Sequence, residues 1–373
     1  MFKKTLVAVA ALAAFGTASA ANVSVYGVLD QTLAYGHQTI DDDNGKTNTD
    51  VFGLEDGYNS PSRWGLKGSE DLGNGLTVSF KLENGFNGDD GTLNQNGRLF
   101  GREASLSLSG GFGTVSFGRM GGVGSSCGTY DLVYGIADAF DGFDNDIGGI
   151  AMSDRYDNMI TYQTPQFNGV QATVQYSFKE DSKAGAGDEG KASANRYASA
   201  AVTGEFGNLN LVAAYEYQNY ASVAGIDRDD GHTVYLGGNY NCGFATTFVM
   251  AQYFKGIRVD QLSWFDAEDV TGVSSTELFS EGIKGFGLHL GTNFPALGGD
   301  ITLAGYYVDA KAEDPDLETL DINYAGVAAR YTYPLSKRTS VYGGAGYGVT
   351  KWEDSTTAKE KITQVYLGLV HSF

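Results

Sequence analysis

The sequence predicts an all-β fold, a 16-stranded antiparallel transmembrane β-barrel, from three observations. Apolar and polar residues alternate with a period of two along most of the chain, which indicates β-strands. Short and long polar connections alternate between these predicted strands. The 373 residues include 53 glycines and 44 tyrosines and phenylalanines but only 5 prolines. This aromatic content excludes intrinsic disorder. No stretch of comparable length places apolar residues at helical spacing.

The alternation is clearest over residues 76–83, 170–179 and 209–218, where apolar and polar side chains fall on opposite faces. Such segments are close to the roughly 9–11 residues of a tilted strand that crosses a bilayer. Lipid cannot hydrogen-bond a free strand edge, so a sheet in the membrane closes on itself, with its apolar face in lipid and its polar face toward water. A soluble β-sandwich also alternates, but it needs a second, interlocking apolar face that this pattern lacks.

The connections between strands set the strand number. Seven short ones carry the Gly, Asn or Pro residues of tight turns, at 71–75, 110–113, 168–169, 207–208, 241–243, 295–299 and 334–338. Eight longer polar ones lie at 37–58, 87–97, 121–157, 181–191, 221–230, 256–280, 310–320 and 351–360. Together they join 16 strands, with short turns at the periplasmic rim and long loops at the extracellular rim.

Residues 1–20 have the pattern of a secretory signal peptide. Two lysines precede an apolar run over 5–15, and small residues at 18–20 provide a cleavage site. The run is shorter than the roughly 20 residues of a membrane-spanning helix. We expect residues 21–373 to form the barrel, and the loss of two lysines lowers the formal charge from −20 to −22.

Composition argues against several classes of function. With 45 acidic and 25 basic residues the chain has no basic stripe, so we expect no nucleic-acid partner. Cys127 and Cys242 stand in no CxxC or metal-type spacing and belong to opposite ends of the predicted barrel, which favours two free thiols. We expect no metal and no cofactor.

The last strand, residues 361–373, alternates up to a terminal Phe373. An alternating final strand that ends in Phe resembles the assembly signal of Gram-negative outer-membrane proteins. Together with the signal peptide it predicts localisation in the outer membrane and a transient partner, the barrel-assembly machinery.

Several segments resemble the Gram-negative trimeric general porins, above all the β-proteobacterial and neisserial type. The most specific is 62–76, and the others are 25–30, 99–102, 113–119 and 156–169. The resemblance implies a homotrimer in contact with outer-membrane lipid and lipopolysaccharide. It also implies passive diffusion of ions and small hydrophilic solutes through a water-filled pore.

In this family the third loop folds inward and narrows the pore, with acids on the loop facing basic groups on the wall. Here that loop is 121–157, the longest connection, which contains no Lys or Arg before Arg155. Its acids provide the expected acidic side of the constriction: Asp131, Asp138, Asp141 and Asp144.

The basic side is predicted partly from alternation. Arg63 and Lys67 share a face opposite Trp64, and Lys81 lies opposite its apolar neighbours, so all three should point into the lumen. Arg102 and Arg155 are assigned to the wall by the resemblance alone, and alternation turns Arg102 outward unless its position at the rim resets it.

These observations favour a general diffusion porin with weak to moderate cation preference, because acids outnumber bases overall and in the third loop. The alternatives are a substrate-specific channel, a barrel enzyme or an adhesin. An enzyme is disfavoured because the four histidines, at 37, 232, 289 and 371, lie in no recognisable nucleophile or metal motif.

Overall fold

The chain forms one antiparallel sheet that closes on itself. The computed structural model describes residues 22–43, 45–142, 147, 149–183, 187–221, 229–262, 282–313, 321–353 and 357–373, and the predicted signal peptide lies outside these residues. The sheet contains 17 strand segments, and β1 pairs with β17 as well as with β2 and β3, which completes the ring. All neighbours pair antiparallel and follow chain order, as the alternation of turns and loops predicts.

The strands are β1 (Asn22–Asp42), β2 (Gly45–Asp56), β3 (Arg63–Gly73), β4 (Leu76–Gly85), β5 (Glu103–Gly110), β6 (Gly113–Gly121), β7 (Arg155–Gln163), β8 (Val170–Ser177) and β9 (Arg196–Phe206). They continue with β10 (Leu209–Asn219), β11 (Gly231–Asn241), β12 (Thr246–Ile257), β13 (Ile283–Ala296), β14 (Gly299–Ala312), β15 (Asp321–Pro334), β16 (Thr339–Glu353) and β17 (Thr357–Ser372). Short helical turns are α2 (Asn94–Gly97), η1 (Gly128–Tyr130), α3 (Tyr134–Ala137) and η3 (Val259–Gln261). None of the described helices is long and apolar enough to span a membrane.

Segments β2 and β3 are two halves of one barrel strand, which confirms the predicted count of 16. Residues 31–42 of β1 pair with β2, and residues 22–28 of β1 pair with β3. The break between the halves is held by Asp30, whose Oδ2 accepts the N–H groups of Asn59 at 2.9 Å and Ser60 at 2.7 Å. The expectation of a loop over 37–58 was therefore wrong. Most of it is strand, and it was missed because residues 37–50 are polar except for Ile40.

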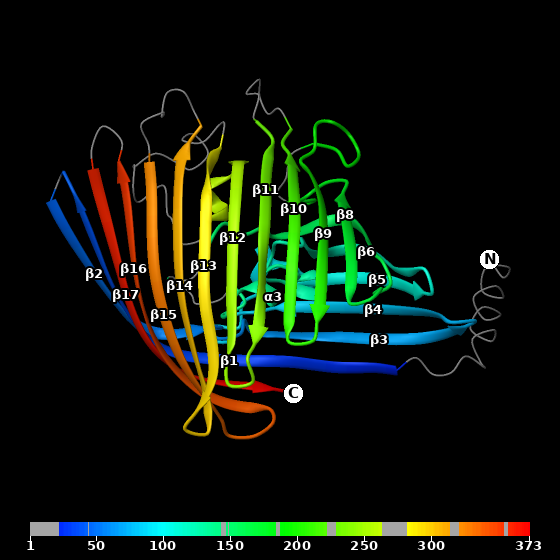
Figure 1. The fold of residues 1–373 in the computed structure, drawn as a ribbon, viewed down its shortest axis with the longest axis horizontal. Helices are drawn as coiled ribbons and strands as arrows, with labels where there is room; N and C mark the ends of the chain where they lie inside the picture. Colours follow the sequence, from blue (N-terminus) through cyan, green and yellow to red (C-terminus); the bar gives the residue numbers. More distant parts are fainter. Residues whose placement is uncertain are drawn as a thin grey trace, which may run out of the picture.

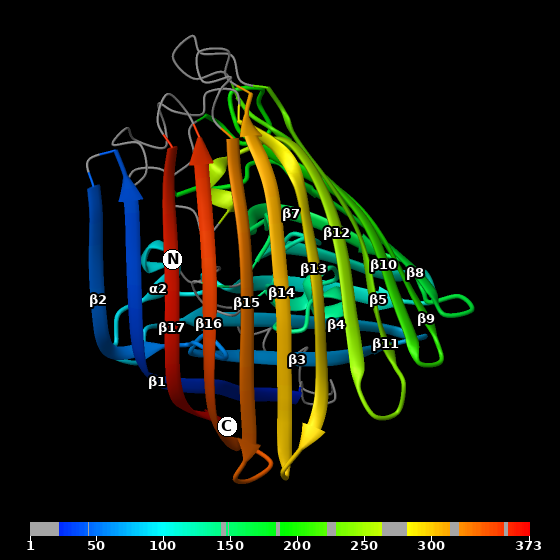
Figure 2. The same ribbon diagram turned by 60° about the vertical axis from the view of Figure 1, so that its left-hand side comes forward.

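Opposite walls of the barrel cross at a steep angle. In Figure 1, β9–β17 stand side by side while β3–β6 run across behind them, and Figure 2 shows β13–β17 following one another toward β1. Closing a sheet into a barrel forces its strands to tilt, so strands on opposite sides must cross. The two walls therefore face each other across the interior without pairing.

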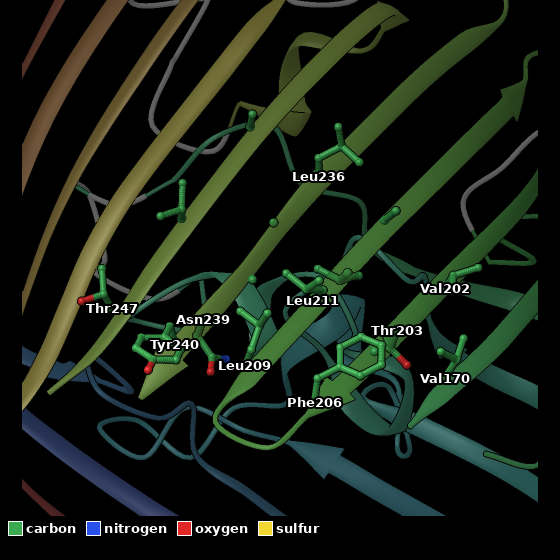
Figure 3. A pocket seen from close by; sticks show the side chains of 17 residues that line it. Val170, Val202, Thr203, Phe206, Leu209, Leu211, Leu236, Asn239, Tyr240 and Thr247 are labelled. Atoms are coloured by element: carbon green, nitrogen blue, oxygen red, sulfur yellow. The ribbon is translucent and has the colours of Figure 1, made fainter. Parts of the chain in front are cut away.

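The outer surface carries the apolar residues, as predicted for a lipid-facing wall. Leu211 on β10, Leu236 on β11 and Val249 on β12 are exposed there. They line an apolar hollow of about 680 Å³ over β8–β12 (Figure 3). Because this hollow lies on the outside of the barrel, it does not belong to the pore.

The third loop, residues 122–154, leaves β6 at Gly121, turns into the barrel and rejoins the wall at β7. Its apolar residues Tyr134 and Ile150 are fully buried against wall residues such as Tyr235, Met250 and Phe254. The main hydrophobic core therefore lies inside the barrel, between this loop and the wall β9–β15. On this wall the inward face is partly apolar, in contrast to the simple expectation of a polar interior.

One buried carboxylate fixes the start and end of the loop. Glu216 on β10 is 3% exposed, and its Oε1 accepts the N–H of Gly124 and the hydroxyl of Ser153, each at 2.9 Å. Its two oxygens also accept the hydroxyls of Tyr197 and Tyr235. Buried carboxylates are stable only when their acceptor sites are filled, so loop and wall order each other at this point.

Further along, amide side chains of the wall bind the loop backbone. Gln252 accepts the N–H of Ala151 at 3.0 Å and donates to its carbonyl at 2.5 Å. Asn239 donates to the carbonyl of Ile136 at 2.7 Å. The loop is thus fastened along its length by strands β10–β12.

The chain end closes the ring at β1. Phe373 donates its N–H to the carbonyl of Gly27 at 3.0 Å and accepts the N–H of Gly27 at 3.1 Å. Its ring lies over Gly27, where a Cβ atom would come 2.3 Å from Phe373 Cζ and 2.7 Å from the backbone oxygen of Arg63. The residue predicted as an assembly signal therefore sits at the junction of the first and last strands.

We expect Glu216→Leu to loosen the third loop while the barrel still forms. The substitution removes four hydrogen bonds, each with a net contribution of about 1 kcal/mol, and leaves their donors buried. Open-channel current noise in planar bilayers should rise. Glu205→Leu, at an exposed position of β9, should leave the noise unchanged. Equal noise in both variants would show that Glu216 does not hold the loop.

We expect Gly27→Val to impair closure of the barrel, because the added side chain collides with Phe373 and with backbone. The measurement is the fraction of protein that migrates as a folded, heat-modifiable barrel after refolding in detergent. Gly36→Val is the matched control on the same strand, since no atom lies within 4 Å of a Cβ at Gly36. The same folded fraction for both variants would contradict the assignment.

Candidate pore constriction

A polar chamber lies between the wall β3–β5 and the third loop. We call this hollow of about 450 Å³ the inner chamber, and it brings together basic groups of the wall and acids of the loop. Its charged lining consists of Arg63, Lys81, Glu83, Arg102, Asp131 and Asp141. Five of the nine charged residues predicted for the constriction therefore line one chamber.

Two of the three wall cations are paired with wall acids. Lys81 Nζ lies 2.9 Å from Glu103 Oε2 and 3.6 Å from Glu83 Oε2, and Arg102 Nε lies 2.8 Å from Glu83 Oε1. Both glutamates are buried, and Glu103 also accepts the N–H of Thr129 on the loop at 3.1 Å. The negative charges of Glu83 and Glu103 thus offset part of the positive electric field of Lys81 and Arg102 in the chamber.

The acids of the loop form a close pair. The carboxyl groups of Asp131 and Asp141 are hydrogen-bonded, and Asp131 also accepts the N–H of Gly135 at 2.9 Å. Desolvation and the negative charge of Asp141 raise the pKa of Asp131 well above its usual range. Desolvation raises the pKa of Asp141 as well, although the hydrogen bond to Asp131 and the positive charge of Arg63 oppose this rise. The pair therefore holds a proton at a pH where an ordinary aspartate has lost it.

A second chamber of about 440 Å³ adjoins the first on the side of the long loops. We call it the outer chamber. Its charged lining is Arg102, Asp154, Arg155, Arg258 and Asp260. The two chambers share Pro61, Arg102 and Ser126. Arg102 thus stands where one polar chamber meets the next.

The other predicted residues lie elsewhere. Lys67 lines neither chamber, and its Nζ lies 4.9 Å from the ring centre of Tyr26. Asp138 is buried, accepts the N–H of Phe140 at 2.7 Å and the hydroxyl of Tyr306 at 3.2 Å, and so faces the wall instead of the pore. Asp144 lies outside the described residues.

Arg102 points inward because it precedes β5, so the alternation of that strand does not apply to it. The sequence reasoning did not single out Glu83 or Glu103 as constriction residues. Glu83 follows Lys81 on the polar face of β4, and Glu103 falls on the polar face that continues through Ser105. Both signals were present in the pattern.

The two cysteines are free thiols. Cys127 is buried in the third loop beside the outer chamber, and Cys242 is exposed in the turn between β11 and β12. One thiol thus lies inside the barrel and the other at its rim, and both are free, which agrees with the prediction from the sequence.

Comparison with known proteins agrees with this architecture. The family model described as Gram-negative porin matches residues 8–351. An outer membrane porin protein of Bordetella pertussis is 33% identical, over 100% of both chains. The solved structure of an anion-selective porin from Comamonas acidovorans is 28% identical, with a TM-score of 0.66, and the match covers 95% of this chain and 100% of that one.

A more distant match shows the fold alone. The trimer form of OmpT, an outer membrane protein of Vibrio cholerae, is 16% identical with a TM-score of 0.57, covering 95% of this chain and 100% of that one. With the sheet closed, the third loop folded inward and the full-length relatives in agreement, this chain belongs to the Gram-negative porin family and is a channel protein of the outer membrane.

Proposed function

We propose that this porin is a general diffusion channel for ions and small hydrophilic solutes, with the inner chamber as its constriction. The observation that carries the proposal is the pair of adjoining polar chambers, which meet at Arg102 and are lined by opposing charges. Opposed charges in a narrow pore select by radius and field without requiring a specific ligand. Arg63, Lys81 and Arg102 form the basic side, and the acidic side is the loop pair.

We further propose a weak cation preference. Lys81 and Arg102 have acid partners on the wall, whereas Arg63 has no ion-pair partner among the described residues. The loop pair Asp131 and Asp141 lines the same chamber as Arg63 and offsets its charge, so the constriction is close to neutral. The formal charge of −22 on the chain without its predicted signal peptide then favours cations at the rims. The Comamonas acidovorans relative is described as anion-selective. In this chain the pairing of Lys81 and Arg102 by Glu83 and Glu103 works against the same preference.

The assembly that we propose is a homotrimer in outer-membrane lipid and lipopolysaccharide, inserted by the barrel-assembly machinery. A solved porin-fold neighbour is described in a trimer form. Passive transport needs no catalytic group, and we propose no enzymatic activity.

The proposal predicts stepwise channel insertion in planar bilayers, with three conductance levels per trimer. Under a salt gradient, the reversal potential should have the sign of a cation-preferring pore. The preference should weaken as salt rises, because the Debye length falls from about 10 Å at 0.1 M to about 3 Å at 1 M. A folded barrel without conductance would refute the diffusion pore, and a reversal potential of anion sign would refute the cation preference alone.

The loop pair predicts a pH dependence of this preference. Because the pKa of Asp131 is raised, the constriction gains a proton and loses negative charge while the pH is still above the value of about 4 at which an ordinary Asp titrates. Cation preference should therefore fall as the pH is lowered through this range. Asp131→Asn should abolish that step, and Asp300→Asn, at an exposed position of β14, should retain it. A step that persists in Asp131→Asn would assign it to another group.

A further inference from the structure

The outer chamber contains buried polar atoms that no described residue satisfies. They are Arg155 Nε, Ser126 Oγ, Gln95 Oε1 and Gln261 Oε1. Native proteins pair nearly all buried polar atoms, because an unpaired one costs free energy. All four are closed off from solvent, so they belong to the polar wall of the chamber, and contacts to its contents come from the charged groups that line it.

The arginines of the chamber retain binding capacity at depth. The side chain of Arg155 is 10% exposed, and its nearest carboxylate oxygen, on Asp154, lies 3.7 Å away. Arg102 is 6% exposed and donates its Nε to Glu83, and its two terminal nitrogens have no hydrogen-bond acceptor among the described residues. Burial, and after it the positive charge of Arg155, lowers the pKa of Arg102, and the two arginines line the same chamber. An anionic group between them would relieve the repulsion between their positive charges.

The acids of the chamber lie at its mouth. The side chain of Asp154 is 72% exposed and that of Asp260 is 63% exposed. Arg258 is already paired, with Nη1 lying 3.0 Å from Glu180 Oε1 and Nε 3.2 Å from Asp260 Oδ1. Arg155, whose nearest carboxylate oxygen is 3.7 Å away, is therefore the least closely paired cation of the chamber and lies deep, whereas the carboxylates of Asp154 and Asp260 lie toward the solvent.

We propose that the outer chamber is a binding subsite for small zwitterionic solutes of the α-amino acid class. The carboxylate of the solute lies between Arg102 and Arg155, and its ammonium group faces Asp154 and Asp260. A simple anion would satisfy the arginines but not these acceptors. A dipolar solute matches both ends of the chamber without adding net charge. The chamber, at about 440 Å³, has room for such a molecule with several waters of ~30 Å³ each.

The position of the subsite gives it a role in flux. Arg102 belongs to both chambers, so a carboxylate that leaves Arg155 can stay in contact with Arg102 and then approach Arg63 in the inner chamber. A binding site in the path makes transport saturable and favours the bound class of solute at low concentration. The inference rests on the proposed diffusion function and names a preferred class of solute within it.

The test uses the mature, refolded protein in proteoliposomes, with initial uptake rates measured for L-alanine, lactate and lactamide. These three probes have similar size and are zwitterionic, anionic and neutral, respectively. Uptake of L-alanine should saturate, whereas that of lactamide should rise linearly. Arg155→Gln should raise the half-saturating L-alanine concentration at least tenfold, and Arg155→Lys less. Arg338→Gln, in the exposed turn between β15 and β16, removes one positive charge away from the chamber and should change nothing.

Asp154→Asn separates a zwitterion site from an anion site, and at this exposed position the substitution does not threaten folding. It should weaken L-alanine uptake without weakening lactate uptake, because only the ammonium group of L-alanine needs the Asp154 carboxylate. Equal saturation by lactate and L-alanine, unaffected by Asp154→Asn, would overturn the proposal in favour of an anion site. Linear L-alanine uptake in a protein with normal conductance would overturn it outright and leave the diffusion pore standing. Absence of conductance and of all uptake would instead refute the proposed function.

Discussion

The absence of water in the bilayer core is the constraint on which the rest of this structure depends. Every backbone N–H and C=O of a lipid-facing strand must be paired within the sheet, so the sheet has to close. Here closure brings residues 28–41 of β1 against β17, and a further pair of hydrogen bonds joins Gly27 to Phe373. Once the ring is closed, its interior is a volume that the chain must either fill or leave to water.

The third loop divides that volume unequally. It packs on the wall β9–β15, where apolar side chains and the carboxylate of Glu216 hold it. The opposite wall, β3–β5, is left facing the loop across a polar gap. The constriction therefore forms because the third loop packs against one wall of the barrel and leaves a gap to the other. In a soluble protein the hydrophobic core lies between two layers of secondary structure. Here it lies between the third loop and one wall of the barrel, and the pore occupies the remaining space.

The sequence was sufficient for the fold because most barrel strands carry their own alternation, although the polar stretch that forms β2 does not. Alternation placed Arg63, Lys67 and Lys81 on the polar faces of β3 and β4, and the turn residues set the strand number. It was not sufficient for the loop, because the loop has no repeating backbone geometry from which a side chain's direction follows. Asp131, Asp138 and Asp141 look alike in sequence, yet Asp138 faces the wall and the other two face the pore. The sequence also could not predict the hydrogen bond between Glu216 and Gly124, because these residues are 92 positions apart.

The pairing of charges explains how an acidic chain can keep a basic wall. A cation beside a pore attracts anions unless a fixed acid offsets it, and Glu83 and Glu103 provide that offset for Lys81 and Arg102. Paired groups are also held in place, so the field in the inner chamber is set by the backbone positions of β3–β5. The outer chamber differs, because the carboxylate nearest to Arg155, on the exposed Asp154, lies 3.7 Å away and offsets its charge less closely. Cations that are paired with fixed acids suit a constriction that passes many solutes. A cation with a less close acid partner suits a site that binds one class of solute for a short time. Both arrangements occur along one path, and they meet at Arg102, which is compensated through Nε and available through its terminal nitrogens.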